Sequence, residues 1–347
     1  MLKVYDSTFE GWNDIVKSFK DYDVYYLKDY CNSFKINGDG EPLLFLFEND
    51  NLKAINVVFK RDIGLSEKLK NKIEKNVYYD LSTPYGYGGW IYEGNYSDDD
   101  VYLLDRVYTD YCIEKNIVSE FVRLHPLLKN YRYLDKTYDI KEIGPTISIK
   151  LDNMTNIWDN YSSKNRNKIR KAKKDDVRIY WGRNPELLKD FVRLYEQNML
   201  YDNADNYYYF SNDFYNSLMH DLRYNFLFFY AVKDGSIISM TIILFANGKI
   251  HYHLSGADIE KRKYAPNNLM LHEVIKWASF NDFKLFHMGG GLGGAQDSLY
   301  KFKKSFNKED STYFYLGKKI FSREIYNQLS KLSDSDSFTD YFPIYRR

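Results

Sequence analysis

The residues with the clearest chemical potential lie in one stretch, residues 286–306, FHMGGGLGGAQDSLYKFKKSF. A short apolar run ends there in five glycines spread over six positions, which begin with Gly289, Gly290 and Gly291. Such a cluster predicts unusual backbone dihedrals or a close approach of the backbone to a ligand. Lysines follow at once, interleaved with aromatic residues. Exposed amides beside lysines suit a ligand that carries or develops negative charge, and a tight loop with solvated lysines is the alternative.

A reaction that develops negative charge on an oxygen is one that these residue types can support. It needs a neutral nucleophile, a stabilised oxyanion and a route for the departing proton. A lysine at the end of the glycine loop can balance the charge of a tetrahedral intermediate without accepting a proton, and we assign this catalytic role to Lys303. Several residues could relay the proton, and the sequence does not choose among them: His251, His253, Asp258, Tyr264 and Tyr300. His253 and Tyr300 are also candidates for substrate binding.

Two basic segments are candidates for binding phosphate. Residues 162–174, SSKNRNKIRKAKK, predict a helix on which Arg166 and Arg170 could clamp an anion, because a guanidinium binds two oxygens together. A solvated helix face is the alternative. The second segment precedes a predicted helix start, a place that favours anions. There the candidates for a donor phosphate are Arg262, Lys263, Asn267 and Asn268.

A third candidate segment is the aromatic and glycine-rich loop at residues 84–89, PYGYGG. Its glycines let the backbone come close to a ligand, and its tyrosines offer flat faces and hydroxyl groups. We therefore predict substrate contacts from Tyr85, Gly86, Tyr87, Gly88 and Gly89. The alternative is a turn whose tyrosines pack inside the protein. The next helix begins with Asp98, Asp99 and Asp100, which already satisfy its positive end and disfavour an anionic ligand there.

The elements that would position these residues predict a mixed α and β fold. Alternating and apolar runs predict strands at 43–48, 53–60, 77–81, 117–124, 143–151, 226–232, 237–245, 249–254, 284–288 and 313–316. Helical spacing predicts helices at 8–20, 98–114, 162–174, 185–200, 213–222, 269–281 and 322–332. Both halves read as a hairpin, a further strand, a long loop, a helix and a strand, without a residue-by-residue repeat.

Composition narrows the class of protein. At 347 residues and 44% hydrophobic content, the chain predicts a folded protein of two domains. Its net charge of +1 gives no global attraction to nucleic acid or membrane, so recognition of charge has to be local. Two cysteines, Cys31 and Cys112, and an N-terminus without an apolar core predict a cytoplasmic location.

Three of these segments together resemble the FemAB-type transferases, which are peptidoglycan interpeptide-bridge enzymes with acetyltransferase-like relatives. They are the PYGYGG loop, the S-x-x-x-R-x-x-I-R-K-A-x-K helix and the ending GGG…LYKFKKSF, and the likeness covers residues 80–306. The resemblance implies two tandem GNAT-like domains, each a mostly antiparallel twisted sheet flanked by helices, with a groove between them. Within the chain we expect domains at 1–151 and 152–310, the second carrying the site, with 311–347 packing back onto the first.

The resemblance also implies an acyltransferase that moves an acyl or aminoacyl group from an activated donor to an amine, on a cell-wall or cell-envelope precursor. It places Lys303 at the junction of acceptor and donor. The donor is an aminoacyl-tRNA or an acyl-CoA, with no tightly bound cofactor. Residues 262–267 lack the glycine turn typical of CoA-binding domains, and residues 175–226 lack the coiled-coil arm of some tRNA users, so both donors stay open. The expected partners are phosphate-bearing substrates, tRNA among them, and peripheral contact with a membrane follows if the acceptor is lipid-linked.

Three other functions are alternatives to acyl transfer. Gly289, Gly291 and Gly294 formally satisfy G-x-G-x-x-G, but no acidic residue ends a next strand at the spacing that a dinucleotide site requires. A metal site is not expected, because the histidines and cysteines show no ligand spacing beyond His251-x-His253. The alternative from another class is a non-catalytic RNA-binding module that uses the basic helix at 162–174.

Overall fold

The computed structural model describes residues 1–334 and 341–347, and these form two compact units. The first unit comprises Met1–Ile143 and Phe314–Arg347, and the second comprises Gly144–Tyr313. The chain therefore changes unit within two of its strands, β7 (Asp139–Lys150) and β13 (Thr312–Ile320). The predicted domains at 1–151 and 152–310 stay a prediction.

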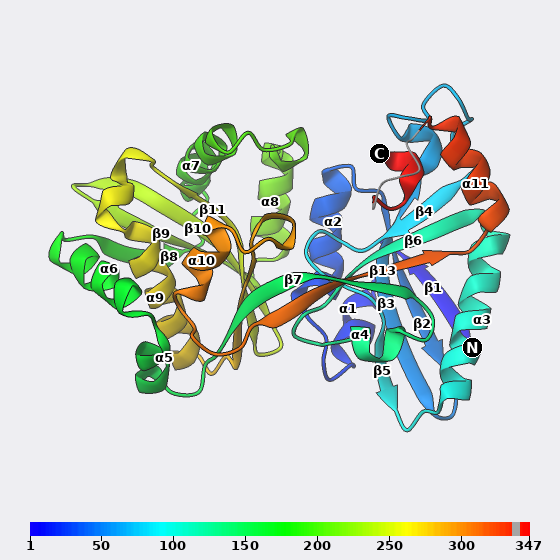
Figure 1. Ribbon diagram of the computed structural model, residues 1–347, viewed down its shortest axis with the longest axis horizontal. Coiled ribbons are helices and arrows are strands. Elements are labelled where there is room, and N and C mark those ends of the chain that lie inside the picture. The colour runs from blue at the N-terminus through cyan, green and yellow to red at the C-terminus, as the bar shows by residue number, and fades with distance from the viewer. Residues whose placement is uncertain (335–340) are drawn as a thin grey trace. The chain divides into compact units, whose positions relative to one another are not determined.

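The first unit is a twisted sheet with helices on its faces (Figure 1). Its other strands are β1 (Leu2–Asp6), β2 (Glu41–Glu48), β3 (Leu52–Asp62), β4 (Tyr79–Ser82), β5 (Ile91–Gly94) and β6 (Ile117–Leu124). Its helices are α1 (Trp12–Lys17), α2 (Lys28–Ile36), α3 (Asp98–Glu114), α4 (Tyr131–Leu134) and α11 (Arg323–Leu332). The strand order is β1-β2-β3-β4-β6-β13, with β5 also on β3, and the β4–β6 pair is parallel while the other pairs are antiparallel.

The second unit repeats this plan with a sheet ordered β7-β12-β11-β10-β9-β8. The strands after β7 are β8 (Arg178–Gly182), β9 (Phe226–Lys233), β10 (Ser236–Ala246), β11 (Lys249–Ala257) and β12 (Leu285–Gly290). Its helices are α5 (Met154–Asn160), α6 (Ser163–Lys174), α7 (Leu187–Tyr201), α8 (Asn212–Asp221), α9 (Pro266–Phe280) and α10 (Ser298–Lys304). Here β11 and β12 form the parallel pair, and the other pairs are antiparallel.

Each parallel pair is joined by a helix, α3 between β4 and β6 and α9 between β11 and β12. Such a crossover needs a helix-length connection, because parallel strands cannot be joined by a short turn. The two tight hairpins of the second unit turn at Asp234-Gly235 and Asn247-Gly248, all with positive φ, as the sequence predicted. The mixed α/β class with mostly antiparallel sheets is thereby confirmed.

The core of the second unit lies between its sheet and one layer of helices. Alternate residues of β9 show the two faces: Leu227 and Phe229 pack with α9 and α6, whereas Phe228 contacts Phe191 of α7. The α9 helix is apolar on most sides, with Met270, Leu271, Val274 and Ile275 fully buried. An aromatic layer of α7 and α8 covers the other face. Burial of these apolar side chains against the sheet stabilises the position of β12 and of its glycine-rich end.

Candidate active site

The glycine stretch forms the end of β12 and a turn into α10. Gly289 has a φ of +74° and lies at an irregularity in the pairing of β12 with β7. A Cβ atom on Gly291 would lie 2.0 Å from the carbonyl oxygen of Ala295 and 2.4 Å from Asp297 Oδ1, so only glycine fits there. Asp297 closes the turn, because its carboxylate accepts from Leu292 N at 3.0 Å and from Tyr300 N at 2.8 Å. The glycines thus make a folded loop rather than an open phosphate cradle.

Lys303 is buried at the end of this loop, with 7% of its surface exposed. Its Nζ donates to the carbonyl oxygen of Gly290 at 2.7 Å and lies 5.9 Å from the ring centre of Tyr252. Burial lowers the pKa of Lys303 to about 8, against the opposing charge of Asp297. An ammonium has three donors, and Gly290 is the one acceptor found for it within residues 1–334 and 341–347. The group is therefore a charged donor held beside the strand end at neutral pH.

The parallel strands β11 and β12 diverge next to this lysine. Their ladder has three residue pairs and ends at His251 opposite His287, although both strands continue. The two imidazoles lie there with ring centres 5.8 Å apart. An extra residue in β11, His253, sits where the register on β10 shifts. Burial and then the neighbouring His251 lower the pKa of His253 to about 3, which makes its imidazole a weak base.

At the corresponding place in the first unit, the parallel strands β4 and β6 do not leave a gap, because the chain after β4 stays hydrogen-bonded to β6. There β4 pairs with β6 through four residues, and the PYGYGG loop continues along β6, with Gly88 N donating to Arg123 O at 2.8 Å. The loop is packed from its own unit: Tyr85 stacks on Phe34, and Tyr87 contacts Tyr25 and Phe314 edge-on. A Cβ on Gly86 would meet the Tyr25 ring at 2.5 Å. Gly89 has a φ of +90°. Substrate contacts from this loop stay a prediction.

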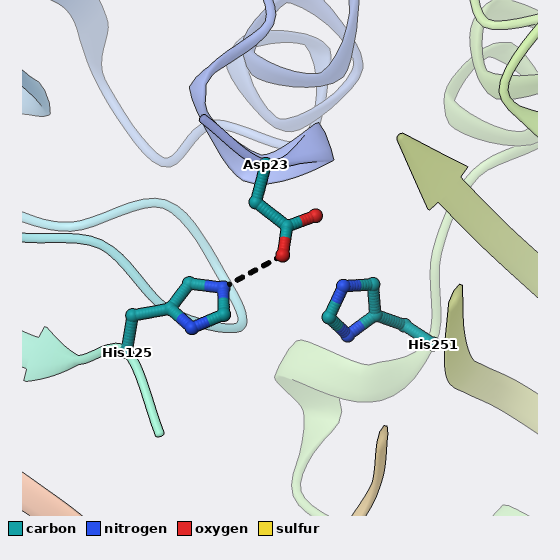
Figure 2. A group of neighbouring side chains, drawn as sticks. All are labelled: Asp23, His125 and His251. Atoms are coloured by element: carbon teal, nitrogen blue, oxygen red, sulfur yellow. Dashed lines mark ion pairs between the residues drawn. The ribbon is translucent and has the colours of Figure 1, made fainter. Parts of the chain in front are cut away.

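A buried Asp23–His125 pair anchors the PYGYGG loop in the first unit. Figure 2 shows the His125 ring turned toward Asp23, with Nε2 3.0 Å from the carboxylate and both side chains without exposed surface. Nδ1 of the ring accepts from the amides of Leu127 and Leu128, which leaves the ring proton on Nε2. His125 N donates to Asn130, and Asn130 Nδ2 donates to Gly88 O at 2.8 Å. His251, also labelled in Figure 2, belongs to β11 of the second unit.

The start of α9 differs from the start of α3 as predicted. Ser97 caps α3 and forms a capping box with Asp100. The α9 helix has no side-chain cap and no acidic residue in its first turn, and it begins at Pro266 after Ala265 with φ +52°. The side chains proposed for phosphate are engaged within the unit. Asn267 accepts from Ser239, Asn268 donates to Asn165 at 2.8 Å, Arg262 lies over Tyr201, and Lys263 lies 5.3 Å from the ring centre of Tyr264.

The two arginines of α6 have different surroundings. Arg166 donates to the carbonyl oxygens of Trp158, Asp159 and Tyr161, at 3.4, 3.1 and 2.6 Å, and so caps the C-terminal end of α5. Arg170 lies over the Trp158 ring at 5.4 Å and donates to Asn167. Arg166 is thus committed to its own unit, whereas Arg170 is exposed. An anion clamp made by both stays a prediction.

Of the predicted residues, the structure brings Gly289, Gly290, Gly291, Tyr300 and Lys303 together at the end of β12. Tyr300 is buried and its hydroxyl hydrogen-bonds to Ser311 at 2.8 Å. The sequence analysis missed Asp297, although an Asp directly before the first residue of a helix is a usual N-cap signal. It also missed the Asp23–His125 pair, for which no local signal exists, because the two residues are far apart in the chain.

Comparisons with known proteins agree on the class. Residues 160–304 match the model of the acetyltransferase (GNAT) domain family. Over 260 residues the chain is 25% identical to the UDP-N-acetylmuramoylpentapeptide-lysine N(6)-alanyltransferase of Weissella viridescens, covering 67% of this chain and 75% of that protein. These two matches favour an enzyme over the RNA-binding alternative.

Solved structures support the fold over nearly the whole chain. The structure of FemX superposes with a TM-score of 0.66 at 14% identity, covering 94% of this chain and 99% of that one. The C-terminal domain of a lysylphosphatidylglycerol synthetase from Agrobacterium fabrum gives 0.53 at 11% identity, covering 91% and 92%. The tandem GNAT-like architecture is thereby confirmed.

No helix within residues 1–334 and 341–347 is long and apolar enough to cross a membrane. The motifs at 84–89, 162–174 and 286–306, the GNAT domain match and the Fem-type relative agree on one assignment. The chain is an acyltransferase with a GNAT-like fold, and it is similar to the FemAB-type transferases.

Proposed function

We propose that this acyltransferase moves an aminoacyl group onto a primary amine of a phosphate-bearing peptidoglycan precursor. The observation that carries the proposal is Lys303, a buried ammonium held 2.7 Å from the Gly290 carbonyl where β11 and β12 diverge. The alanyltransferase of Weissella viridescens, to which the chain is similar, supports the choice of acceptor, because its name specifies the lysine N6 amine of a UDP-linked muramoyl pentapeptide.

In this reaction the neutral amine attacks the ester carbonyl carbon of the donor, and a C–N bond forms. Negative charge then develops on the former carbonyl oxygen, and the Lys303 ammonium donates a hydrogen bond to that oxygen. Collapse of the intermediate breaks the C–O bond of the ester. The proton lost by the amine nitrogen ends on the departing hydroxyl oxygen. Lys303 stays protonated throughout, so it acts on charge and not as a base.

The donor favoured by these observations is an aminoacyl-tRNA. The loop before α9 lacks glycine, and the side chains of Asn267 and Asn268 bind Ser239 and Asn165, which leaves no glycine-built pyrophosphate turn at this helix start. The GNAT domain match favours acyl-CoA as the second candidate, because that family is described as acetyltransferases. The two donors differ in the leaving group, a ribose hydroxyl or a thiol.

The test is a transfer assay with each donor and a UDP-linked muramoyl pentapeptide that contains lysine. Products are read by mass spectrometry, which shows one added aminoacyl or acetyl residue on the amine. We expect an aminoacyl product with charged tRNA. An acetylated product with acetyl-CoA alone would replace the donor assignment. Tight, salt-dependent tRNA binding without any product would contradict the enzymatic proposal.

A further inference from the structure

We propose that Asp297 is a positioning residue, which holds the glycine loop and α10 together so that the Lys303 ammonium lies at the Gly290 carbonyl and stays charged. This inference rests on the proposed function, because it concerns the group that we place at the reacting oxygen. It assigns Asp297 no contact with substrate.

The first support is a closed chain of contacts through the Asp297 carboxylate. One oxygen accepts from Leu292 N, at the start of the loop, and the other accepts from Tyr300 N, in the first turn of α10. One turn further along α10, Lys303 reaches back to Gly290, the residue where β12 ends. The carboxylate therefore fixes both segments that the lysine bridges.

The second support is that the loop backbone packs closely against this carboxylate. A Cβ on Gly291 would lie 2.0 Å from the carbonyl oxygen of Ala295 and 2.4 Å from Asp297 Oδ1, distances that no real side chain tolerates. A Cβ on Gly293, in the same loop, would meet no atom within 4 Å. The loop thus excludes a side chain at the position that faces Asp297 and leaves room at a position that does not.

The third support is electrostatic. The elements around Lys303 carry these titratable groups: His287 on β12, then Lys249, His251, Tyr252 and His253 on β11, and Asp297, Tyr300, Lys301 and Lys304 on its own segment. Lys301 is exposed, and Lys304 donates to the carbonyls of Lys308 and Glu309. Among these groups, Asp297 is the charge that raises the pKa of Lys303 against burial. Burial raises the pKa of Asp297, but its backbone hydrogen bonds and then the charge of Lys303 outweigh burial, so this pKa lies below the ordinary carboxyl value.

The test compares Asp297→Asn with Asp310→Asn, an exposed carboxylate of the same unit, in full-length enzyme. Asparagine is also a good N-cap, so the variant removes the charge while one amide oxygen can still accept from Tyr300 N. We expect the pH at which kcat levels off to be lower in Asp297→Asn, with kcat at pH 8.5 reduced on the order of tenfold, the effect of a one-unit change in the pKa of Lys303. Asp310→Asn should keep the profile of the unsubstituted enzyme.

A readout independent of activity separates this inference from the proposed function. The ¹³Cε resonance of Lys303, assigned by its loss in Lys303→Met, is titrated by NMR in both variants. A lower titration midpoint in Asp297→Asn supports the inference even if no donor or acceptor gives transfer. An unchanged midpoint and an unchanged profile shape would overturn it, including when kcat falls equally at every pH.

Discussion

Burial determines what Lys303 can do. Loss of hydration penalises its charged form, so the pKa lies at about 8 rather than at the ordinary lysine value. The ammonium is the main form at neutral pH and is lost as the pH rises through 8. A group that donates to an oxyanion should therefore fail in alkaline solution, although the acceptor amine becomes a better nucleophile there.

This gives the first prediction, on pH. The kcat for transfer should rise up to pH 8 as the acceptor amine loses its proton, and level off above pH 8, because each further gain in neutral acceptor is matched by loss of the Lys303 ammonium. In Lys303→Arg, any residual activity should keep rising beyond pH 8, because guanidinium stays charged. The measurement is kcat against pH from 6 to 10 at saturating substrates. If kcat of the unsubstituted enzyme keeps rising to pH 10, transfer does not need Lys303 in its ammonium form.

The second prediction concerns Arg166 and Arg170. Arg166→Ala should lower the free energy of unfolding by about 1.5–3 kcal/mol, because carbonyls at the end of α5 lose a charged donor. Arg170→Ala is the matched control, since its exposed side chain donates to nearby Asn167 and lies over Trp158. Thermal or urea unfolding measures both. Equal stability of the two variants, with equal loss of substrate binding, would restore the two-arginine anion clamp.

At this scale the sequence indicates part of the candidate site. Lys303 and the three glycines could be proposed from the sequence because glycine clusters and an interleaved lysine leave a local signature. The environment of Arg166 could not be predicted, because an arginine that binds phosphate and one that binds the carbonyl groups of α5 look the same in the sequence. The same holds for Asn268, whose partner Asn165 lies on another helix.

The element that matters most is the β12 end and the turn after it. The third prediction is that Gly291→Ala lowers kcat by 10-fold or more, on the order of the effect of misplacing a reacting group. Its Cβ would collide with Ala295 O and Asp297, so the loop and Lys303 must shift.

Gly293→Ala is the control for this change. Its φ is +58°, so alanine costs about 1 kcal/mol of stability, but its Cβ meets nothing within 4 Å. We expect near-normal kcat. The result that contradicts the account is a Gly291→Ala enzyme as active as Gly293→Ala.

Elements with strong local signals were predicted closely. The bounds of α3 and β6 match the sequence prediction, because Ser97 and Asp100 cap the helix and apolar residues mark the strand. Short elements were missed, such as α2 and α5. In α2, Asn32 and Cys31 have weak helix propensity, and the helix owes its stability to the buried Tyr30 and Phe34.

For the whole molecule, the last residues of the chain complete the first unit. Arg346 and Arg61 both donate to Asp80, a carboxylate without exposed surface. Burial raises the pKa of Asp80, but the charges of Arg61 and Arg346 outweigh it, and the pKa lies below the ordinary value. Alternation along a strand could not show these long-range pairs. For the same reason, the points where the chain changes unit, inside β7 and β13, could not be predicted.

The fourth prediction follows from this ion pair. Arg346→Met should destabilise the first unit by about 1.5–3 kcal/mol, the cost of losing a charged hydrogen bond. Since the folded pKa of Asp80 is lowered, the stabilisation is present above the ordinary carboxyl pKa and is lost as the pH falls through the folded value. Arg347→Met, which changes an exposed side chain, is the control. Unfolding at pH 7 that does not distinguish the two variants would count against a structural role for the C-terminal end.

The central claim is that a FemAB-type fold transfers an aminoacyl group with Lys303 as its charged donor to the oxyanion. The most direct test is the single-turnover rate of transfer from charged tRNA to the muramoyl pentapeptide by Lys303→Met. Lys301→Met, an exposed lysine of the same helix, is measured beside it. We predict a loss of about 100- to 1,000-fold for Lys303→Met, typical of removing one oxyanion donor, and none for Lys301→Met. A folded Lys303→Met enzyme that turns over at the normal rate would contradict the account.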